Sequence, residues 1–400
     1  MAEVLLWLEL LGRWLHIITG IAWIGASFYF VWLDNHLQPP SNADAHVAGE
    51  LWAVHGGGFY QSRKFAGAPP QMPETLHWFK WEAYTTWLSG MFLLILIYWA
   101  GASVYLIDPN VREMSTSMAI GIGAGYLLGG WIIYDRLCRS PLGKRPRTLS
   151  AVLFVVLVLA AWSLCQLFGG RGAFIHYGAL IGTIMVANVA HIIIPGQRRM
   201  VAALEAGEPI NPEDGLRGKQ RSVHNTYLTL PVLFVMISNH YANTYSGEWN
   251  WLILIGMTVA GALIRVYFVD RHTGKQSPLT LVLALIVLAL SALLAGGHLT
   301  PTNRAAAIDT DAPVSAATVS LDTVTGIVLA RCTGCHANEP TWPGFVSAPA
   351  GVVLETPEDV ERYAVRIHEQ TVVLKAMPIG NLTGITDDER TAIANWFSNR

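Results

Sequence analysis

Residues 332–336 read Cys-Thr-Gly-Cys-His, the spacing by which a c-type haem is attached to a protein. In this pattern Cys332 and Cys335 form thioether bonds, and His336 is an iron ligand. A haem iron that carries electrons takes a second axial ligand, for which Met377 is the candidate. The alternative for the two cysteines is a redox or zinc pair, but no second pair of zinc ligands follows in the sequence. The motif therefore predicts one covalent haem c.

Most of the remaining sequence is apolar: 52% of the 400 residues are hydrophobic and only 14% are charged. Eight long runs are almost free of charged residues, and each reaches the roughly 20 residues that a spanning helix needs. They lie approximately at 14–33, 83–107, 114–134, 148–170, 172–197, 222–247, 249–269 and 276–303. The sequence therefore predicts an all-α fold, with an eight-helix transmembrane bundle over residues 1–300.

The last quarter of the chain differs in composition. Residues 301–320 are rich in Ala, Thr, Asp and Pro without periodicity, which predicts a flexible linker. Residues 321–400 are expected to form a small helical domain like a class I cytochrome c. Its last helix begins with a capping box from Thr386 to Glu389, and Gly326 is expected to let that helix cross the first one closely.

Lysine and arginine are unevenly divided between the loops on the two sides of the predicted bundle. One set of loops carries sixteen of them and the alternate set three, and positive loops stay in the cytoplasm. Both termini and the cytochrome domain are therefore expected in the periplasm, with the chain in a bacterial inner membrane. Attachment of c-type haem on the outer side of that membrane requires the same orientation. A net charge of −2 gives no reason to expect nucleic acid as a partner.

Several histidines fall within the apolar runs, where ionisable residues favour a functional role. His16, His176 and His240 are expected at the periplasmic side. Two histidines on facing helices at one depth can bind a haem b, so His16 with either His176 or His240 is a candidate pair for a second haem. The alternative for each is a hydrogen bond to a neighbouring helix or a position at the membrane interface.

A long connector after the first apolar run carries His55 followed by three glycines, whose backbone can approach a ligand closely. The alternative is a plain turn before a basic patch. Candidate binding residues, by stacking, amide pairing and charge, are Phe59, Tyr60, Gln61 and Arg63. Candidate general bases are His55, His77 and Glu82.

Four stretches together suggest a family. The first is Arg-Trp-Leu-His at 13–16 with the segment 20–25 that follows it, and the second is 52–60, which contains Trp-Ala-Val-His and three glycines. The third is the aromatic segment 78–84, and the fourth is 221–227, which begins Arg-Ser-Val-His-Asn. They resemble the PuuD-type membrane-bound urate hydroxylases of bacteria, and the resemblance extends over essentially the whole chain. It implies an eight-span urate oxidase N-terminal domain joined to a cytochrome c domain. It also implies an oxidoreductase that converts urate to 5-hydroxyisourate and passes electrons through haem c to the respiratory chain, without producing peroxide.

Urate is a flat monoanion at neutral pH, and its oxidation needs stacking, amide pairing, a cation and a base. On this basis Asn225 joins the four candidate binding residues above, and His224 joins His55 and Glu82 as a candidate base. The expected partners are urate, membrane lipid, and a soluble cytochrome c or a terminal oxidase.

Distance constrains this hypothesis. Urate bound at the cytoplasmic face would lie about 30 Å of hydrocarbon away from an exported haem. Either an intermediate haem lies in the bundle, or the urate site lies towards the outer side. Two other functions remain open: a substrate-free membrane relay that passes electrons from quinol or a partner to a terminal oxidase, and a membrane protein that handles haem or copper.

Overall fold

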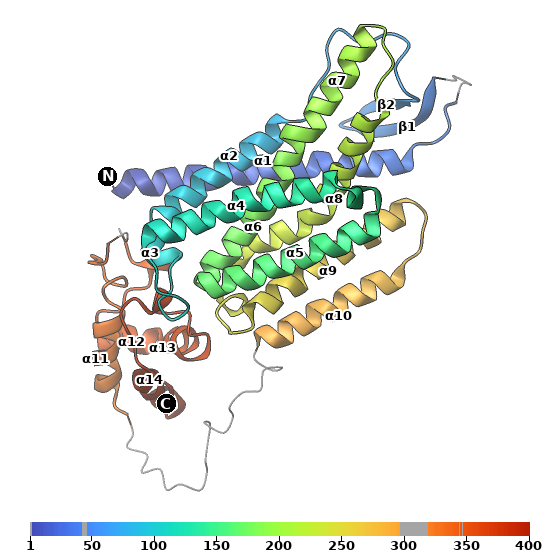
Figure 1. The fold of residues 1–400 in the computed structure, drawn as a ribbon. Coiled ribbons are helices and arrows are strands. Elements are labelled where there is room, and N and C mark those ends of the chain that lie inside the picture. The colour runs from blue at the N-terminus through green and yellow to red at the C-terminus, as the bar shows by residue number, and fades with distance from the viewer. Residues whose placement is uncertain (1, 42–45, 297–318, 344, 346) are drawn as a thin grey trace.

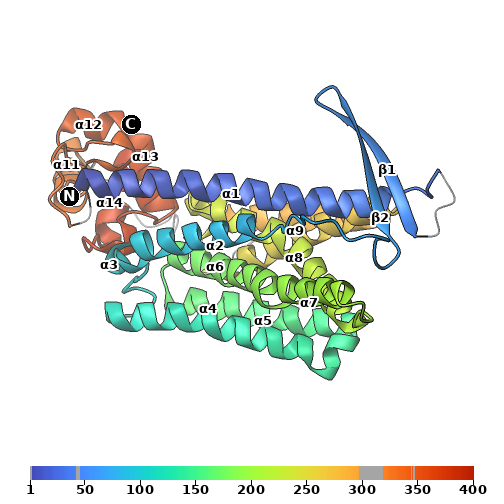
Figure 2. The ribbon, with the colours of Figure 1, turned by 90° about the horizontal axis from the view of Figure 1, so that it is seen from above.

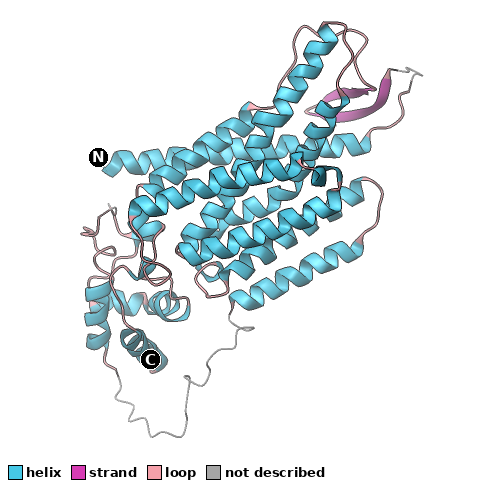
Figure 3. Cartoon of the chain, viewed as in Figure 1, coloured by secondary structure: helices cyan, strands magenta, loops and turns pink. Residues whose placement is uncertain are grey.

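The structure is a computed structural model that describes residues 2–41, 46–296, 319–343, 345 and 347–400. Most of the expected linker, 301–318, lies outside the described residues. The described chain is mostly helical, as predicted, and is drawn in Figures 1 and 3. One β-hairpin departs from the expected all-α fold.

The described residues between 2 and 295 form a helix bundle with one hairpin. In chain order it contains α1 (Ala2–His36), β1 (Val47–His55), β2 (Gly58–Phe65), α2 (Trp81–Leu93), η1 (Leu94–Trp99), α3 (Ala102–Tyr105), α4 (Thr116–Arg139), η2 (Pro141–Lys144), α5 (Pro146–Leu167), α6 (Gly170–Asn188), η3 (Val189–Ile193), α7 (Ile194–Glu205), α8 (Pro212–Ser238), η4 (Ala242–Thr244), α9 (Asn250–His272) and α10 (Pro278–Ala295).

The C-terminal part is a smaller helical unit. It contains α11 (Leu321–Arg331), η6 (Pro349–Gly351), α12 (Pro357–Arg362), α13 (Ala364–His368), η7 (Glu369–Val373), η8 (Ile379–Asn381) and α14 (Asp387–Ser398).

Each of the eight expected apolar runs overlaps helix. Among the described residues, six helical segments are long and apolar enough to cross a membrane: α1, α4, α5, α6 continued through α7, α9 and α10. The other two apolar runs, 83–107 and 222–247, are not among these six segments. One is divided among α2, η1 and α3, and the other falls on α8, whose first turns carry several charged residues. The composition of the six segments indicates association with a membrane.

Helix α6 lies in the middle of the bundle (Figure 1), and most of its residues are buried. Tyr177 and Phe174 on α6 pack with Leu254 of α9 and Val235 of α8 in one apolar core. By contrast, α1 and α10 expose many large apolar side chains on the outer surface. An apolar exterior around a packed helical interior is the arrangement expected of a bundle that contacts lipid.

The predicted glycine segment after His55 forms the turn of a two-stranded antiparallel hairpin. His55 pairs with Gly58 across the turn, and the two intervening residues, Gly56 and Gly57, have φ angles of 56° and 81°. A two-residue hairpin turn with positive φ at both positions favours glycine. The hairpin projects from one end of the bundle, as Figure 2 shows, so the end that carries it is called the hairpin end.

The C-terminal unit has its own apolar core, in which Val324 and Val328 of α11 pack with Ile393 and Trp396 of α14. The predicted capping box is confirmed, because the Thr386 and Glu389 side chains each bond to the other residue's backbone amide. The prediction for Gly326 is wrong. A Cβ built at this position meets nothing within 4 Å, so the crossing of α11 and α14 does not require a glycine there.

The C-terminal unit lies at the end of the bundle where α1 begins, opposite the hairpin end (Figures 1 and 2). The two parts meet through side chains: the rings of Tyr105 and Phe345 have centroids 6.5 Å apart. The N-terminus and the C-terminal unit therefore share one end of the bundle, which is called the N-terminal end below.

Candidate functional site

A cavity of about 380 Å³ lies within the C-terminal unit. Its lining includes all four residues that the sequence assigns to haem c: Cys332, Cys335, His336 and Met377. Apolar side chains complete much of the wall, among them Leu354, Ile367 and Leu382. The cysteines and the two candidate iron ligands, which are up to 45 positions apart in the sequence, thus face one largely apolar space.

The orientation of the His336 ring is set by one hydrogen bond. Its Nδ1 lies 2.9 Å from the carbonyl oxygen of Val352, and because a carbonyl only accepts, Nδ1 is the donor. The proton on Nδ1 leaves the lone pair on Nε2. A histidine that ligates iron through Nε2 is commonly held in this way by a backbone carbonyl.

The two cysteines of the motif are partly buried. Burial raises the pKa of the Cys332 thiol to about 12, and burial also raises the pKa of Cys335. Catalytic redox pairs use thiolates, so this environment does not favour a redox pair. Among the described residues there is also no group of three or more His, Cys, Asp or Glu side chains placed to hold a metal ion.

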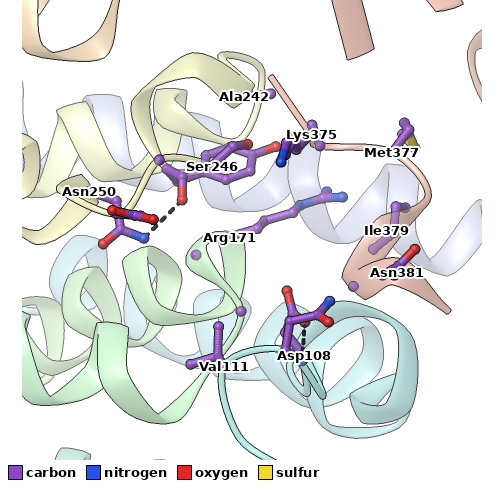
Figure 4. A pocket seen from close by; sticks show the side chains of 18 of the residues that line it. Asp108, Val111, Arg171, Ala242, Ser246, Asn250, Lys375, Met377, Ile379 and Asn381 are labelled. Carbon is purple, nitrogen blue, oxygen red and sulfur yellow. Dashed lines mark hydrogen bonds between the residues drawn. The ribbon is translucent and has the colours of Figure 1, made fainter. Parts of the chain in front are cut away.

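A second cavity, of about 770 Å³, lies between the N-terminal end of the bundle and the C-terminal unit (Figure 4), and is called the junction cavity. The bundle contributes Tyr105, Asp108, Arg171, Tyr245 and Asn250, among others. The C-terminal unit contributes Gln370, Lys375, Met377, Asn381 and Arg390, among others. Met377 lines both cavities. This candidate iron ligand therefore lies between the cavity that contains Cys332 and Cys335 and the junction cavity.

Arg171 extends into the junction cavity from the first turn of α6 (Figure 4). Its guanidinium carbon lies 5.1 Å from the ring centroid of Tyr105, and its Nε donates to the side-chain oxygen of Asn239 at 3.3 Å. Gly169 and Gly170, at the N-terminus of the same helix, also line the cavity. A helix N-terminus and a guanidinium on one wall both attract an anion.

Gly170 is required at that wall, because a Cβ there would come within 1.9 Å of the carbonyl oxygen of Tyr245. Sequence analysis counted Arg171 only as a loop charge, and it missed both Tyr105 and the cavity. The available signal was a lone arginine directly after two glycines at the start of an apolar run.

The predicted binding residues of the hairpin lie at the surface. Phe59 and Tyr60 are 79% and 57% exposed. Gln61 donates to Glu50 at 2.9 Å, and the Nε of Arg63 lies 3.6 Å from the same carboxylate. The structure does not gather these side chains with Asn225, which is buried in α8.

The three candidate bases near this end are also dispersed. His55 is exposed at the hairpin turn, and the His77 ring packs edge-on against Phe79 at 4.5 Å. Glu82 lies in the first turn of α2, where one carboxylate oxygen, Oε2, is buried without a hydrogen-bond partner.

His224 and Asn225 belong to a polar cluster buried between α4, α6 and α8. The Tyr134 hydroxyl lies 2.8 Å from His224 Nδ1. Asn188 donates both to Tyr134 Oη, at 3.0 Å, and to Asn225 Oδ1, at 2.9 Å. Sequence analysis missed Tyr134 and Asn188, although a lone amide within an apolar run was a signal for the latter.

The three histidines proposed for a membrane haem do not converge. Both ring nitrogens of His176 are engaged: Nδ1 donates to the Gly172 carbonyl at 2.8 Å, and Nε2 accepts from Trp99 at 3.1 Å. His16 Nδ1 lies 2.9 Å from the Thr86 carbonyl oxygen, and His240 is exposed beyond α8.

Their depths also differ. The His16 ring lies against Gly90, whereas His176 contacts Trp99, nine residues and therefore about 14 Å further along the helical segment. This arrangement does not fit an iron between His16 and His176. For these two histidines it matches the alternative of hydrogen bonds within and between helices.

The bundle matches a known family. A model of the urate oxidase N-terminal family matches residues 2–295, which is the helix bundle from the start of α1 to the end of α10. No curated protein and no solved structure matches the chain. The family match indicates a urate-related function for the bundle.

Proposed function

Because the chain belongs to the urate oxidase N-terminal family, we propose that it oxidises urate to 5-hydroxyisourate and delivers the electrons to a haem c in its own C-terminal unit. In this proposal the bundle spans a bacterial inner membrane eight times, with the hairpin end in the cytoplasm and the C-terminal unit in the periplasm. The excess of sixteen Lys and Arg over three in the corresponding loops supports this orientation.

The observation that carries the proposal is that Met377 lines both cavities. A substrate in the junction cavity would lie beside a ligand of the electron acceptor. Urate at the hairpin end, by contrast, would lie about 30 Å away across the bundle. We therefore assign urate to the junction cavity rather than to the hairpin, and the route needs no intermediate haem.

The walls of the junction cavity suit a planar anion. Arg171 and the N-terminus of α6 provide positive charge, and Tyr105 provides an aromatic surface beside the guanidinium. Amide side chains that can pair with the N–H and C=O edges of the purine are Gln166, Asn250 and Gln370. The cavity thus combines the charge, stacking and amide pairing that urate requires.

The reaction balances as urate and water giving 5-hydroxyisourate, two electrons and two protons. Asp108 and Glu248 line the bundle side of the cavity and can take up the protons. Arg171 holds the urate charge and so orients the ring for attack by water.

The residues around the smaller cavity fit a covalent haem. Cys332 and Cys335 would hold it through thioethers, and His336 Nε2 and the Met377 sulfur would face its iron. When bound, the haem would accept the two electrons one at a time, passing each on to a soluble cytochrome c or a terminal oxidase before taking the next.

The test is an anaerobic titration of the oxidised, purified full-length protein with urate, followed by the absorbance of the c-type haem. We expect urate to reduce the haem and 5-hydroxyisourate to form. Arg171→Gln should abolish this reduction, whereas Arg112→Gln, a change at an exposed loop arginine, should not. A c-type haem that urate never reduces would overturn the proposal and favour the substrate-free electron relay.

A further inference from the structure

Arg265 is a buried cation without a counter-charge. It lies on α9, and the residue is only 5% exposed. Its Nε and Nη2 atoms are buried and have no hydrogen-bond partner, and among the described residues no carboxylate pairs with it. An unpaired charge inside a membrane bundle is costly, so such a residue indicates a function that uses the charge.

The other deeply buried arginines of the described chain are compensated. Arg221 donates through Nη2 to Asp135 at 2.8 Å, so its charge is paired although Nη1 has no partner. Arg390 donates to the carbonyl oxygens of Thr371 and Met377. Arg265 differs from both because neither a carboxylate nor a carbonyl faces its free edge.

The free edge of Arg265 has a defined recognition geometry. Nε and Nη2 lie side by side on one edge of the guanidinium, and together they form the two-pronged donor that matches two adjacent acceptor atoms. The flat face of the group is covered, since its carbon lies 3.9 Å from the ring centroid of Phe28 on α1. This contact with the ring restrains the guanidinium and leaves the Nε and Nη2 edge for a flat ligand.

We propose that Arg265 and Phe28 form a second site for a planar organic anion with two adjacent acceptor atoms. The inference rests on the proposed function, because urate is then the anion of this class that the protein handles. Arg265 lies fifteen residues along α9 from Asn250, which lines the junction cavity, and therefore about 22 Å away from it. The second site thus lies towards the hairpin end and receives urate from the cytoplasmic side before oxidation at the other end.

The experiment counts binding sites rather than turnover. Equilibrium dialysis of radiolabelled urate against the purified full-length protein, kept fully reduced in detergent, should give two urates per chain, because the reduced protein cannot oxidise the ligand. Arg265→Gln should give one, and so should Arg171→Gln. Arg265→Lys keeps the charge but loses the fork, and it should weaken one site by about tenfold. Arg271→Gln, an exposed change on the same helix, should retain both.

Two results would overturn the inference. One is a stoichiometry of one urate in the unsubstituted protein, with no change in Arg265→Gln or Arg265→Lys. The other is bound lipid phosphorus that the unsubstituted protein retains and Arg265→Gln loses, which would make the ligand a lipid headgroup. The two proposals fail separately: full turnover in Arg171→Gln would remove the junction site, whereas unchanged binding in the Arg265 variants would remove only the second site.

Discussion

The ring of Tyr105, at the N-terminal end of the bundle, lies 6.5 Å from the ring of Phe345 in the C-terminal unit. Tyr105 also lines the junction cavity, and Phe345 lines the cavity that holds Cys332 and Cys335. The two rings therefore join the proposed urate site to the proposed haem site. Docking of the two parts, rather than either part alone, creates this path.

Phe345→Ala should weaken docking of the C-terminal unit. A contact between aromatic rings contributes about 1 kcal/mol, so we expect the docked population, and with it the rate of haem reduction by urate, to fall by about fivefold. Stopped-flow absorbance of the c-type haem measures this rate. Phe397→Ala, a change in the C-terminal unit outside both cavity linings, is the control. An unchanged rate in Phe345→Ala would show that the ring pair does not support electron transfer.

In the proposed haem site, Met377→Ala should remove one iron ligand but leave the haem attached through Cys332 and Cys335. The absorption spectrum of the oxidised protein should change from low spin to high spin, and the reduced protein should bind carbon monoxide. Met377→His should restore the low-spin spectrum. A low-spin spectrum in Met377→Ala would assign the sixth ligand to another residue.

Gly123→Ala should destabilise the bundle. A Cβ at this position would lie 2.7 Å from His176 Nε2, in a helix interface where the ring also accepts from Trp99. Overpacking of this kind costs about 1–3 kcal/mol. Gly121→Ala is a matched control two residues away, where a Cβ meets nothing within 4 Å. Thermal unfolding of the detergent-solubilised protein, followed by size-exclusion fluorescence, should separate the two variants; equal stabilities would contradict the placement of His176.

The ion pair between Arg331 and Glu389 predicts a pH dependence for the C-terminal unit. Burial opposes ionisation of Glu389, but hydrogen bonds from the Thr386 amide and Arg331 outweigh it and hold the pKa below its ordinary value of 4.5. The stabilisation is therefore fully present above pH 4.5 and is lost as the pH falls through the lower folded value. Glu389→Gln should cost about 1 kcal/mol at pH 7 and reduce this acid sensitivity.

Thermal unfolding of the full-length protein between pH 3 and pH 7, followed by the haem absorbance, provides the measurement. Glu361→Gln is the control, since this residue is exposed on α12 and lines neither cavity, and no hydrogen bond or ion pair to its side chain is found among the described residues. Identical pH profiles for Glu389→Gln and the unsubstituted protein would contradict the prediction.

Sequence analysis located the helices because membrane helices are determined locally, by the length and composition of each apolar run. It also named Met377, since a haem motif requires a second ligand at some distance along the chain. It could not find Arg171 or Tyr105, because the junction cavity exists only where two separate units meet. The hairpin was missed for a different reason: three consecutive glycines permit a loop as readily as a turn, and the strand pairing is settled by partners such as Glu50 and Gln61.

A substitution of His55 can show whether the local sequence pattern or the three-dimensional arrangement identifies the catalytic base. The sequence suggested it as a base beside a glycine-rich binding loop, but in the structure it is an exposed residue at the end of a projecting hairpin. We therefore expect His55→Ala to retain urate turnover within about twofold of the unsubstituted protein, since changes at exposed positions rarely disturb a distant site. Steady-state reduction of a soluble cytochrome c by urate provides the measurement, with Arg171→Gln as the inactive reference. A loss of turnover in His55→Ala comparable to that in Arg171→Gln would return the catalytic base to the hairpin and remove the junction cavity from the mechanism.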